Sequence, residues 1–224
     1  MFFTELNCGS TVRSAYEQLY NPFTRLYYCF LSSVLPKFTQ LNLLFQSERV
    51  VITELHRQVC NLYKELLLMY MNHEYIVKTM LSKVDPRYQH EFLMLEQVYL
   101  GASVLKTITD NPELSKHKKE MYEFRFHCRL FLIVAAEQIR KRFNFGDEVL
   151  SRMHMLEPAS VLGIQGKVQE QSLVPLATHL PRIIAQDDST LQQLDDEWKK
   201  LAVEDLPESI TNMAKKWTKQ LQPA

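Results

Sequence analysis

The chain has 224 residues, which is enough for one large domain or two small ones. Hydrophobic residues make up 46% and charged residues 23%, so we expect a folded globular protein rather than a disordered one. Lysine plus arginine and aspartate plus glutamate number 26 each, so no overall basic field exists to drive non-specific binding of nucleic acids. Only 5 residues are glycine, which disfavours turn-rich β-sandwiches and nucleotide folds built on glycine loops.

The first part of the chain predicts two amphipathic helices. They cover residues 10–20 and 23–46, and Pro22 separates them because proline disfavours helical angles in the residue before it. Apolar residues recur every three or four positions in the second helix, as on one face of an α-helix. Pro36 lies inside that pattern and predicts a kink or a short break near residues 32–36.

A third helix follows Ser47, which can cap it. Its apolar residues are spaced by alternating steps of three and four, over fewer than three heptads. We therefore expect a long helix packed in a bundle rather than a free coiled coil. The apolar residues of this pattern are Ile52, Leu55, Val59, Leu62, Leu66 and Met69.

Proline-containing cap signals predict the next two helices. The signal at residues 85–86 predicts a helix that continues past Gly101 to Ile108. The signal at residues 110–113 predicts a long helix that ends near Phe143.

The C-terminal part predicts shorter helices. One covers residues 148–156, and a second lies near residues 171–184, where two prolines interrupt it. Ser189 and Gln192 match the capping-box pattern and open a helix through Leu201.

The predicted fold is all-α: a multi-helix bundle with long amphipathic helices and no substantial sheet. We expect a main helical domain over residues 1–157, a loop over 158–170, and C-terminal helices over 171–224 that pack on the same domain. The longest apolar stretches are far shorter than the roughly 20 residues that span a bilayer, so we expect no membrane association.

Few residues are spaced in a way that carries chemistry. His56 and Cys60 share a helix face but lack a second ligand pair with zinc spacing, so we interpret them as a polar edge of the bundle. The acids at 187–188 and 195–197 are explained by helix capping better than by metal-dependent catalysis. The four cysteines are interpreted as structural thiols. We therefore expect no catalytic residue, no metal, no cofactor and no small-molecule substrate.

Two basic clusters are candidates for contact with a nucleic-acid backbone; the alternative is an ordinary solvated surface. They are about 20 residues apart, so on one continuous helix they would lie at opposite ends, some 30–35 Å apart. The first cluster is Lys116, Lys118 and Lys119, and the second is Arg140, Lys141 and Arg142.

Three blocks of the sequence resemble hAT-superfamily transposases and their domesticated vertebrate derivatives. Residues 16–56 contain FLSSVLPKFTQLNLLFQSE, residues 126–143 read FHCRLFLIVAAEQIRKRF, and residues 180–201 contain LPRII and LDDEWKKL. The order and spacing of the blocks agree with that family.

The resemblance implies an origin for the chain as well as a role. The family's catalytic core is a ribonuclease H-like fold that carries two aspartates and a glutamate, and a large helical domain is inserted into it. This chain looks like that insertion, because the catalytic aspartates belong upstream of Tyr16. The resemblance implies a nuclear protein without enzymatic activity of its own, which holds DNA, partner proteins or a second copy of itself.

Two other functions remain open. The chain could be a cytosolic helical scaffold without nucleic-acid binding, or, less favoured, a nuclease with an unrecognised site.

Overall fold

The computed structural model describes residues 21–46, 52–157 and 172–201, with the isolated positions 204, 207, 209 and 212. The described residues are helical and contain no strand, which confirms the all-α fold; their β-structure is limited to a bridge between Met71 and Phe92. The predicted helix 10–20, the cap at Ser47 and the loop 158–170 lie outside these residues. The elements are α2 (Pro22–Phe45), α3 (Ile52–Leu68), α4 (His73–Lys78), η1 (Leu81–Lys83), η2 (Gln89–Glu91), η3 (Leu95–Gln97), α5 (Ala102–Asp110), η4 (Pro112–Lys116), α6 (Lys118–Arg142), α7 (Glu148–Arg152), η5 (Met153–Leu156), α10 (Val174–Ala177) and α11 (Asp188–Leu201).

The chain divides into two compact units. The first unit comprises Met1–Gln46 and Cys60–Phe143, and the second comprises Ser47–Val59 and Asn144–Ala224. Helix α3 therefore contributes its first half to the second unit and its second half to the first. The predicted packing of residues 171–224 on the main domain stays a prediction.

Helix α2 begins at the predicted break and runs without interruption. The Asn21 side chain accepts a hydrogen bond from the Phe23 amide at 2.9 Å, and Pro22 occupies the first helical position. The predicted kink or short break near residues 32–36 is not a break, since the helix continues through Pro36 to Phe45; the kink stays a prediction. The fully or almost fully buried residues of the helix all precede the proline; they are Leu26, Phe30 and Val34.

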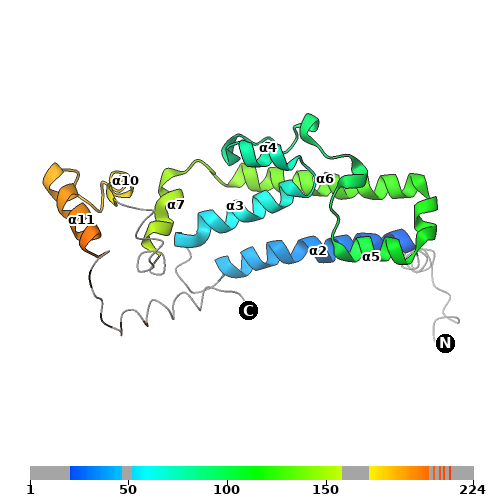
Figure 1. The fold of residues 1–224 in the computed structure, drawn as a ribbon, viewed down its shortest axis with the longest axis horizontal. Helices are drawn as coiled ribbons and strands as arrows, with labels where there is room; N and C mark the ends of the chain where they lie inside the picture. Colours follow the sequence, from blue (N-terminus) through cyan, green and yellow to red (C-terminus); the bar gives the residue numbers. More distant parts are fainter. Residues whose placement is uncertain are drawn as a thin grey trace, which may run out of the picture. The chain divides into compact units, whose positions relative to one another are not determined.

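Helices α2 and α6 run parallel to each other (Figure 1). Their ring contacts advance in the same direction along both helices: Phe23 meets His117, Tyr27 meets Phe124 at 4.9 Å, and Phe30 meets Phe131 at 5.7 Å. These edge-to-face aromatic pairs fix the register of the two longest helices.

Helix α5 packs against a different side of α2. The Cys29 Sγ lies 3.7 Å from the Thr107 Oγ1, and the Ser33 hydroxyl donates to the Leu100 carbonyl at 3.3 Å. Just before α5, Gly101 adopts a φ of +98°, a left-handed conformation that disfavours side chains. A Cβ atom there would lie 2.5 Å from the Ser33 Oγ, so the contact requires glycine.

The predicted helix from residue 86 past Gly101 to Ile108 is wrong. The chain instead forms turns and short 3-10 helices up to Gly101, and α5 begins only at Ala102. The reason is that backbone amides in this stretch bond to distant carbonyls rather than to the preceding turn: Leu93 donates to Tyr70 at 2.9 Å, and Tyr99 donates to Met69 at 2.8 Å.

Side chains from the turn after α3 and from α6 complete the hydrogen bonds of this irregular stretch. The buried Tyr70 hydroxyl donates to the Pro86 carbonyl at 3.0 Å, and burial raises the pKa of this phenol. Arg125 donates to the carbonyls of Leu95 and Glu96 at 3.2 and 3.1 Å. The stretch is therefore held by specific polar contacts, as buried backbone groups require.

The second unit contains short capped helices. The Asp147 carboxylate accepts from the Leu150 amide at 2.8 Å and caps α7, which begins where the predicted helix 148–156 does. The expected helix near 171–184 is wrong: only the four residues of α10 are α-helical, and turns follow them, because Pro181 cannot continue a helix. The Thr53 hydroxyl donates to the buried Glu157 carboxylate at 2.8 Å, which ties the start of α3 to the end of η5.

Gly101→Ala tests the contact between the start of α5 and α2. We expect it to lower the free energy of unfolding by about 2 kcal/mol, because the new methyl group meets Ser33 and the residue is strained at positive φ. Gly146→Ala is the matched control, since its nearest neighbour would be the Asn144 Oδ1 at an ordinary 3.5 Å. Chemical denaturation measures both; equal stability of the two variants would contradict the assigned role of Gly101.

Candidate functional site

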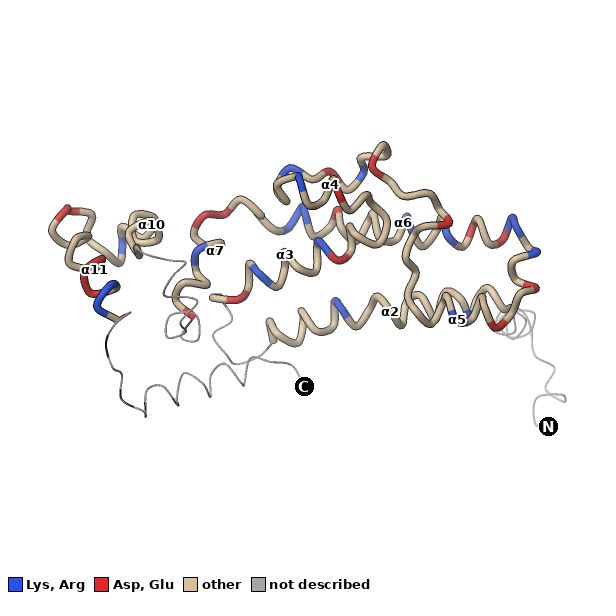
Figure 2. Tube along the Cα trace, in the orientation of Figure 1, with Lys and Arg blue, Asp and Glu red and all other residues tan. Residues whose placement is uncertain are grey.

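The two predicted basic clusters lie at opposite ends of α6. Because α6 is one unbroken helix of 25 residues, its ends are about 37 Å apart. Lys118 and Lys119 begin the helix, directly after Lys116 of η4, and Arg140, Lys141 and Arg142 form its last turn. The clusters therefore do not form a single basic patch, and Figure 2 shows charge of both signs along this helix.

Carboxylates accompany the cluster at the start of α6. The Lys116 Nζ lies 2.6 Å from Glu113, and the Lys119 Nζ lies 4.0 Å from Glu123. All four side chains are more than half exposed, so these pairs stabilise the fold only slightly. They do reduce the positive potential at this end of the helix.

The cluster at the end of α6 is partly neutralised in the same way. Arg140 pairs with Asp85 at 3.3 Å, and Lys141 pairs with Glu137 at 3.2 Å. Hydrogen bonds from Arg87 and then from Lys141 lower the pKa of the Glu137 carboxyl. Arg142 is exposed and has no ion-pair partner among the described residues, so it is the most available cation of this cluster.

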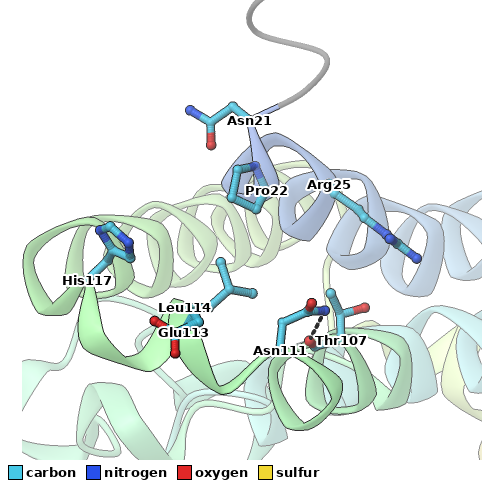
Figure 3. Close-up of a pocket in the computed structure, with 8 residues that line it drawn as sticks. All are labelled: Asn21, Pro22, Arg25, Thr107, Asn111, Glu113, Leu114 and His117. Carbon is cyan, nitrogen blue, oxygen red and sulfur yellow. Dashed lines mark hydrogen bonds between the residues drawn. The ribbon is translucent and has the colours of Figure 1, made fainter.

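A shallow pocket of about 410 Å³ lies where the starts of α2 and α6 meet the end of α5 and η4 (Figure 3). Arg25 and His117 lie at opposite ends of it, and the buried Leu114 forms its apolar wall. Most of the other lining groups are exposed and polar. The pocket has the volume of a small-ligand site but offers little apolar surface for a ligand to bury.

Most of the thiols and histidines among the described residues have structural contacts or are buried. Among the residues that the structure describes, no three His, Cys, Asp or Glu side chains converge in a way that could hold a metal ion. Burial raises the pKa of Cys60, and it raises the pKa of Cys128 to about 12, so both thiols stay protonated at neutral pH. His56 Nε2 lies 3.4 Å from the Phe145 carbonyl, whereas His127 Nδ1 shares a 2.9 Å hydrogen bond with Tyr27.

The acidic residues near α11 have structural contacts. Asp187 caps this helix by accepting from the Thr190 amide at 2.9 Å. The predicted cap at Ser189 is therefore wrong by two residues. The Ser189 hydroxyl itself donates to Asp187. Asp195 pairs with Lys199 at 2.7 Å and accepts from the Leu173 amide, which ties the start of α10 to α11.

An apolar surface runs along α2 and α6, and the sequence reasoning missed it. Successive residues of an α-helix are 100° apart around its axis, and this spacing places the side chains of the surface on one side of the α2–α6 pair, away from α5. The signal in the sequence that could have found it is the recurrence of large apolar residues every four positions along α6, at Tyr122, Phe126, Leu130 and Val134. We call this surface the α2–α6 face; its exposed residues are Tyr28 and Leu35 on α2 and Tyr122, Phe126, Leu130 and Val134 on α6.

The residues of the α2–α6 face have large, well exposed side chains. Its six side chains are 40% to 61% exposed, and Tyr122 stacks on Phe126 with ring planes 8° apart. Helix α2 carries only two charged residues, Arg25 and Lys37, and Figure 2 shows its trace almost without charge. Exposed apolar side chains grouped in this way make the face a candidate interaction site.

Comparisons of the chain with protein-family models, with curated proteins and with solved structures found no match. The resemblance to hAT transposases therefore stays a prediction. None of the helices among the described residues has the length and apolar character that a membrane span requires.

The cap of α11 generates a pH prediction. Hydrogen bonds from Ser189 and Thr190 lower the pKa of Asp187 to about 2, below its ordinary value near 4. A lowered pKa means that the cap stabilises α11 fully above pH ~4 and loses this effect as the pH falls toward 2. We expect the NMR chemical shift of the Thr190 amide to change with pH with a midpoint near 2. In the Asp187→Asn variant this change should be absent. A midpoint near 4 would show that Asp187 does not cap the helix.

Proposed function

We propose that this chain is a helical assembly domain, without catalytic activity of its own, that binds another protein through the α2–α6 face. The observation that carries the proposal is the exposure of six aromatic and aliphatic side chains on two packed helices, with Glu123 as an exposed charged residue between Tyr122 and Phe126. Such surfaces bury apolar area on association, which is the main favourable term in protein–protein binding.

The resemblance to hAT transposases supports an assembly role. The first resembling block, residues 16–56, includes all of α2, and the second, residues 126–143, includes Phe126, Leu130 and Val134 of α6. Both helices of the face thus come from blocks that resemble the family's helical insertion. We propose on this ground that the chain derives from such a transposase and acts in the nucleus.

The described acids and thiols support a non-enzymatic role. Asp187 and Asp195 are engaged in capping and ion pairing, and the thiol of Cys128 is buried and protonated. Metal-dependent phosphoryl transfer needs carboxylates that converge on cations, and these acids are instead held by helix α11 and its neighbours.

Site-specific photo-cross-linking tests the face. A photoreactive phenylalanine analogue in place of Leu130 is expected to form covalent adducts with a protein in cells, because this side chain lies in the centre of the face. The same analogue in place of Val77, which is 82% exposed on α4, is the control and is expected to give far less adduct. No adduct at Leu130, or equal yields at both positions, would contradict the proposal.

Cell fractionation separates the nuclear role from that of a cytosolic scaffold. We expect the chain to sediment with nuclei when the full sequence is expressed. Exclusive recovery in the cytosol, with Leu130 adducts retained, would favour the scaffold and leave protein binding intact.

DNA-backbone binding at the end of α6 is a second candidate function. Its supporting observation is the run of Arg140, Lys141 and Arg142 in the last turn, in which Arg142 has no ion-pair partner among the described residues. Replacing all three by glutamine should weaken binding to a DNA duplex and reduce the slope of log affinity against log salt by up to about three. Replacing Lys116, Lys118 and Lys119 by glutamine is the matched comparison. Binding without salt dependence, or unaffected by either triple variant, would exclude these clusters.

A further inference from the structure

One turn of the chain brings two tyrosines and two arginines together around Asp85. The Asp85 amide donates to the Tyr75 hydroxyl at 3.4 Å, and the Asp85 carbonyl accepts from the Tyr88 amide at 3.1 Å. The Asp85 carboxylate accepts from the Arg87 amide at 3.1 Å and from the Arg140 guanidinium at 3.3 Å. Residues from α4, from the turn after η1 and from the end of α6 thus meet at one aspartate, and we call these five residues the Asp85 surface.

A second ion pair holds this turn against α6. The Arg87 guanidinium lies 2.7 Å from Glu137, which precedes Arg140 by about one helical turn. Backbone hydrogen bonds anchor the residues that follow the turn, since the Asn72 amide donates to the Glu91 carbonyl at 2.8 Å. The Asp85 surface is therefore fixed beside the basic last turn of α6.

The Tyr88 ring is open to solvent. Its side chain belongs to a residue that is 43% exposed. The neighbouring rings of Tyr75 and His90 have their centroids 5.8 and 5.5 Å away, with planes inclined to it by 52° and 62°. Neither neighbour stacks flat on Tyr88, so the ring retains surface on which a planar ligand can stack.

Positive charge is in excess around this ring, although the chain is neutral overall. Residues 81–92 and the last two turns of α6 carry five cations and three carboxylates. All five cations are exposed, whereas two of the carboxylates are partly buried. The cations are Lys83, Arg87, Arg140, Lys141 and Arg142, and the carboxylates are Asp85, Glu91 and Glu137.

An exposed aromatic ring among guanidinium groups matches the chemistry of a single nucleic-acid strand. The bases of a single strand stack on aromatic side chains, and its phosphates bind cations. In a duplex the bases stack on one another, and an acidic peptide has no base to stack. Arg87 and Arg140 each use one guanidinium nitrogen in the ion pairs above, and because a guanidinium has five N–H donors, others remain for a phosphate.

We propose that the Asp85 surface binds single-stranded nucleic acid, with a base stacked on Tyr88 and the adjoining phosphates bound by Arg87 and Arg140. The proposal rests on the second candidate function and deepens it, because it names a single strand rather than a duplex as the ligand at this end of α6. It does not depend on protein binding at the α2–α6 face.

Fluorescence anisotropy of the full chain with a labelled DNA strand of about 12 nucleotides, and with the corresponding duplex, tests the ligand. At about 50 mM salt we expect the strand to bind with a Kd of about 10 to 100 µM and the duplex at least about threefold more weakly. A site that bound phosphates alone would prefer the duplex, which has about twice as many phosphates per unit length. Equal or tighter binding of the duplex would overturn the proposal.

Substitution of Tyr88 tests the stacking. Tyr88→Ala should weaken binding of the strand at least about fivefold, and Tyr88→Phe, which keeps the ring, should stay within about twofold of the unmodified chain. Tyr122→Ala is the matched control, since Tyr122 is 57% exposed but lies about 27 Å from Arg140 along α6. Circular dichroism checks that each variant is folded. No loss in Tyr88→Ala, or an equal loss in Tyr122→Ala, would refute the assigned site.

Substitution of Arg87, which lies outside the basic cluster of α6, tests the phosphate contact. Arg87→Gln should weaken binding of the strand and lower the slope of log affinity against log salt by up to about one. Unchanged affinity and slope would show that Arg87 does not bind a phosphate and would remove it from the site.

The outcomes separate this inference from the second candidate function. If the duplex binds as tightly as the strand and Tyr88→Ala has no effect, while the triple glutamine variant of residues 140–142 weakens binding, the backbone contact stands and the single-strand site falls. If neither nucleic acid binds, both fall. Protein binding at the α2–α6 face is tested separately by the Leu130 cross-link.

Discussion

The first unit depends on the packing of α2 between α5 and α6. An isolated helix of this length is marginally stable in water, so α2 requires neighbours that bury its apolar stripe. Phe30 and Val34 lie in that stripe, with Phe131 edge-on to Phe30 and Gly101 close beside Ser33. These contacts set the register of α2 against both neighbours at once, so a change on one side is transmitted to the other.

The charges of the chain act mostly over short distances. Equal numbers of acidic and basic residues cancel in the net charge, and many of the described ones are also paired locally, as with Glu137 between Arg87 and Lys141. Helix caps use further acids, such as Asp147 and Asp187. The α2–α6 face carries few charges, and this, together with its exposure, is why we propose it as the surface that binds a protein partner.

Sequence patterns succeeded where local chemistry decides the structure. Asn21, Pro22 and Asp147 occupy the caps that their residue types favour, and α6 ends at Arg142, next to the predicted Phe143. Its start is later than predicted, because residues 112–116 form the 3-10 helix η4. The cap signal at residues 85–86 failed because the backbone after it finds partners far away along the chain. Hydrogen bonds to residues 69–72 outweigh the local preference for a helix, and no periodic pattern records them.

The sequence alone determined the helical character, the positions of the long helices and the placement of the basic clusters at two ends of one rod, because spacing and capping are properties of neighbouring residues. Only the tertiary structure decided which side of each helix is covered. α6 carries apolar residues around most of its circumference, and Phe124 is buried against α2 while Leu130 is left exposed. The difference arises from the parallel packing of two helices far apart in the chain, which the spacing of apolar residues within either helix does not encode.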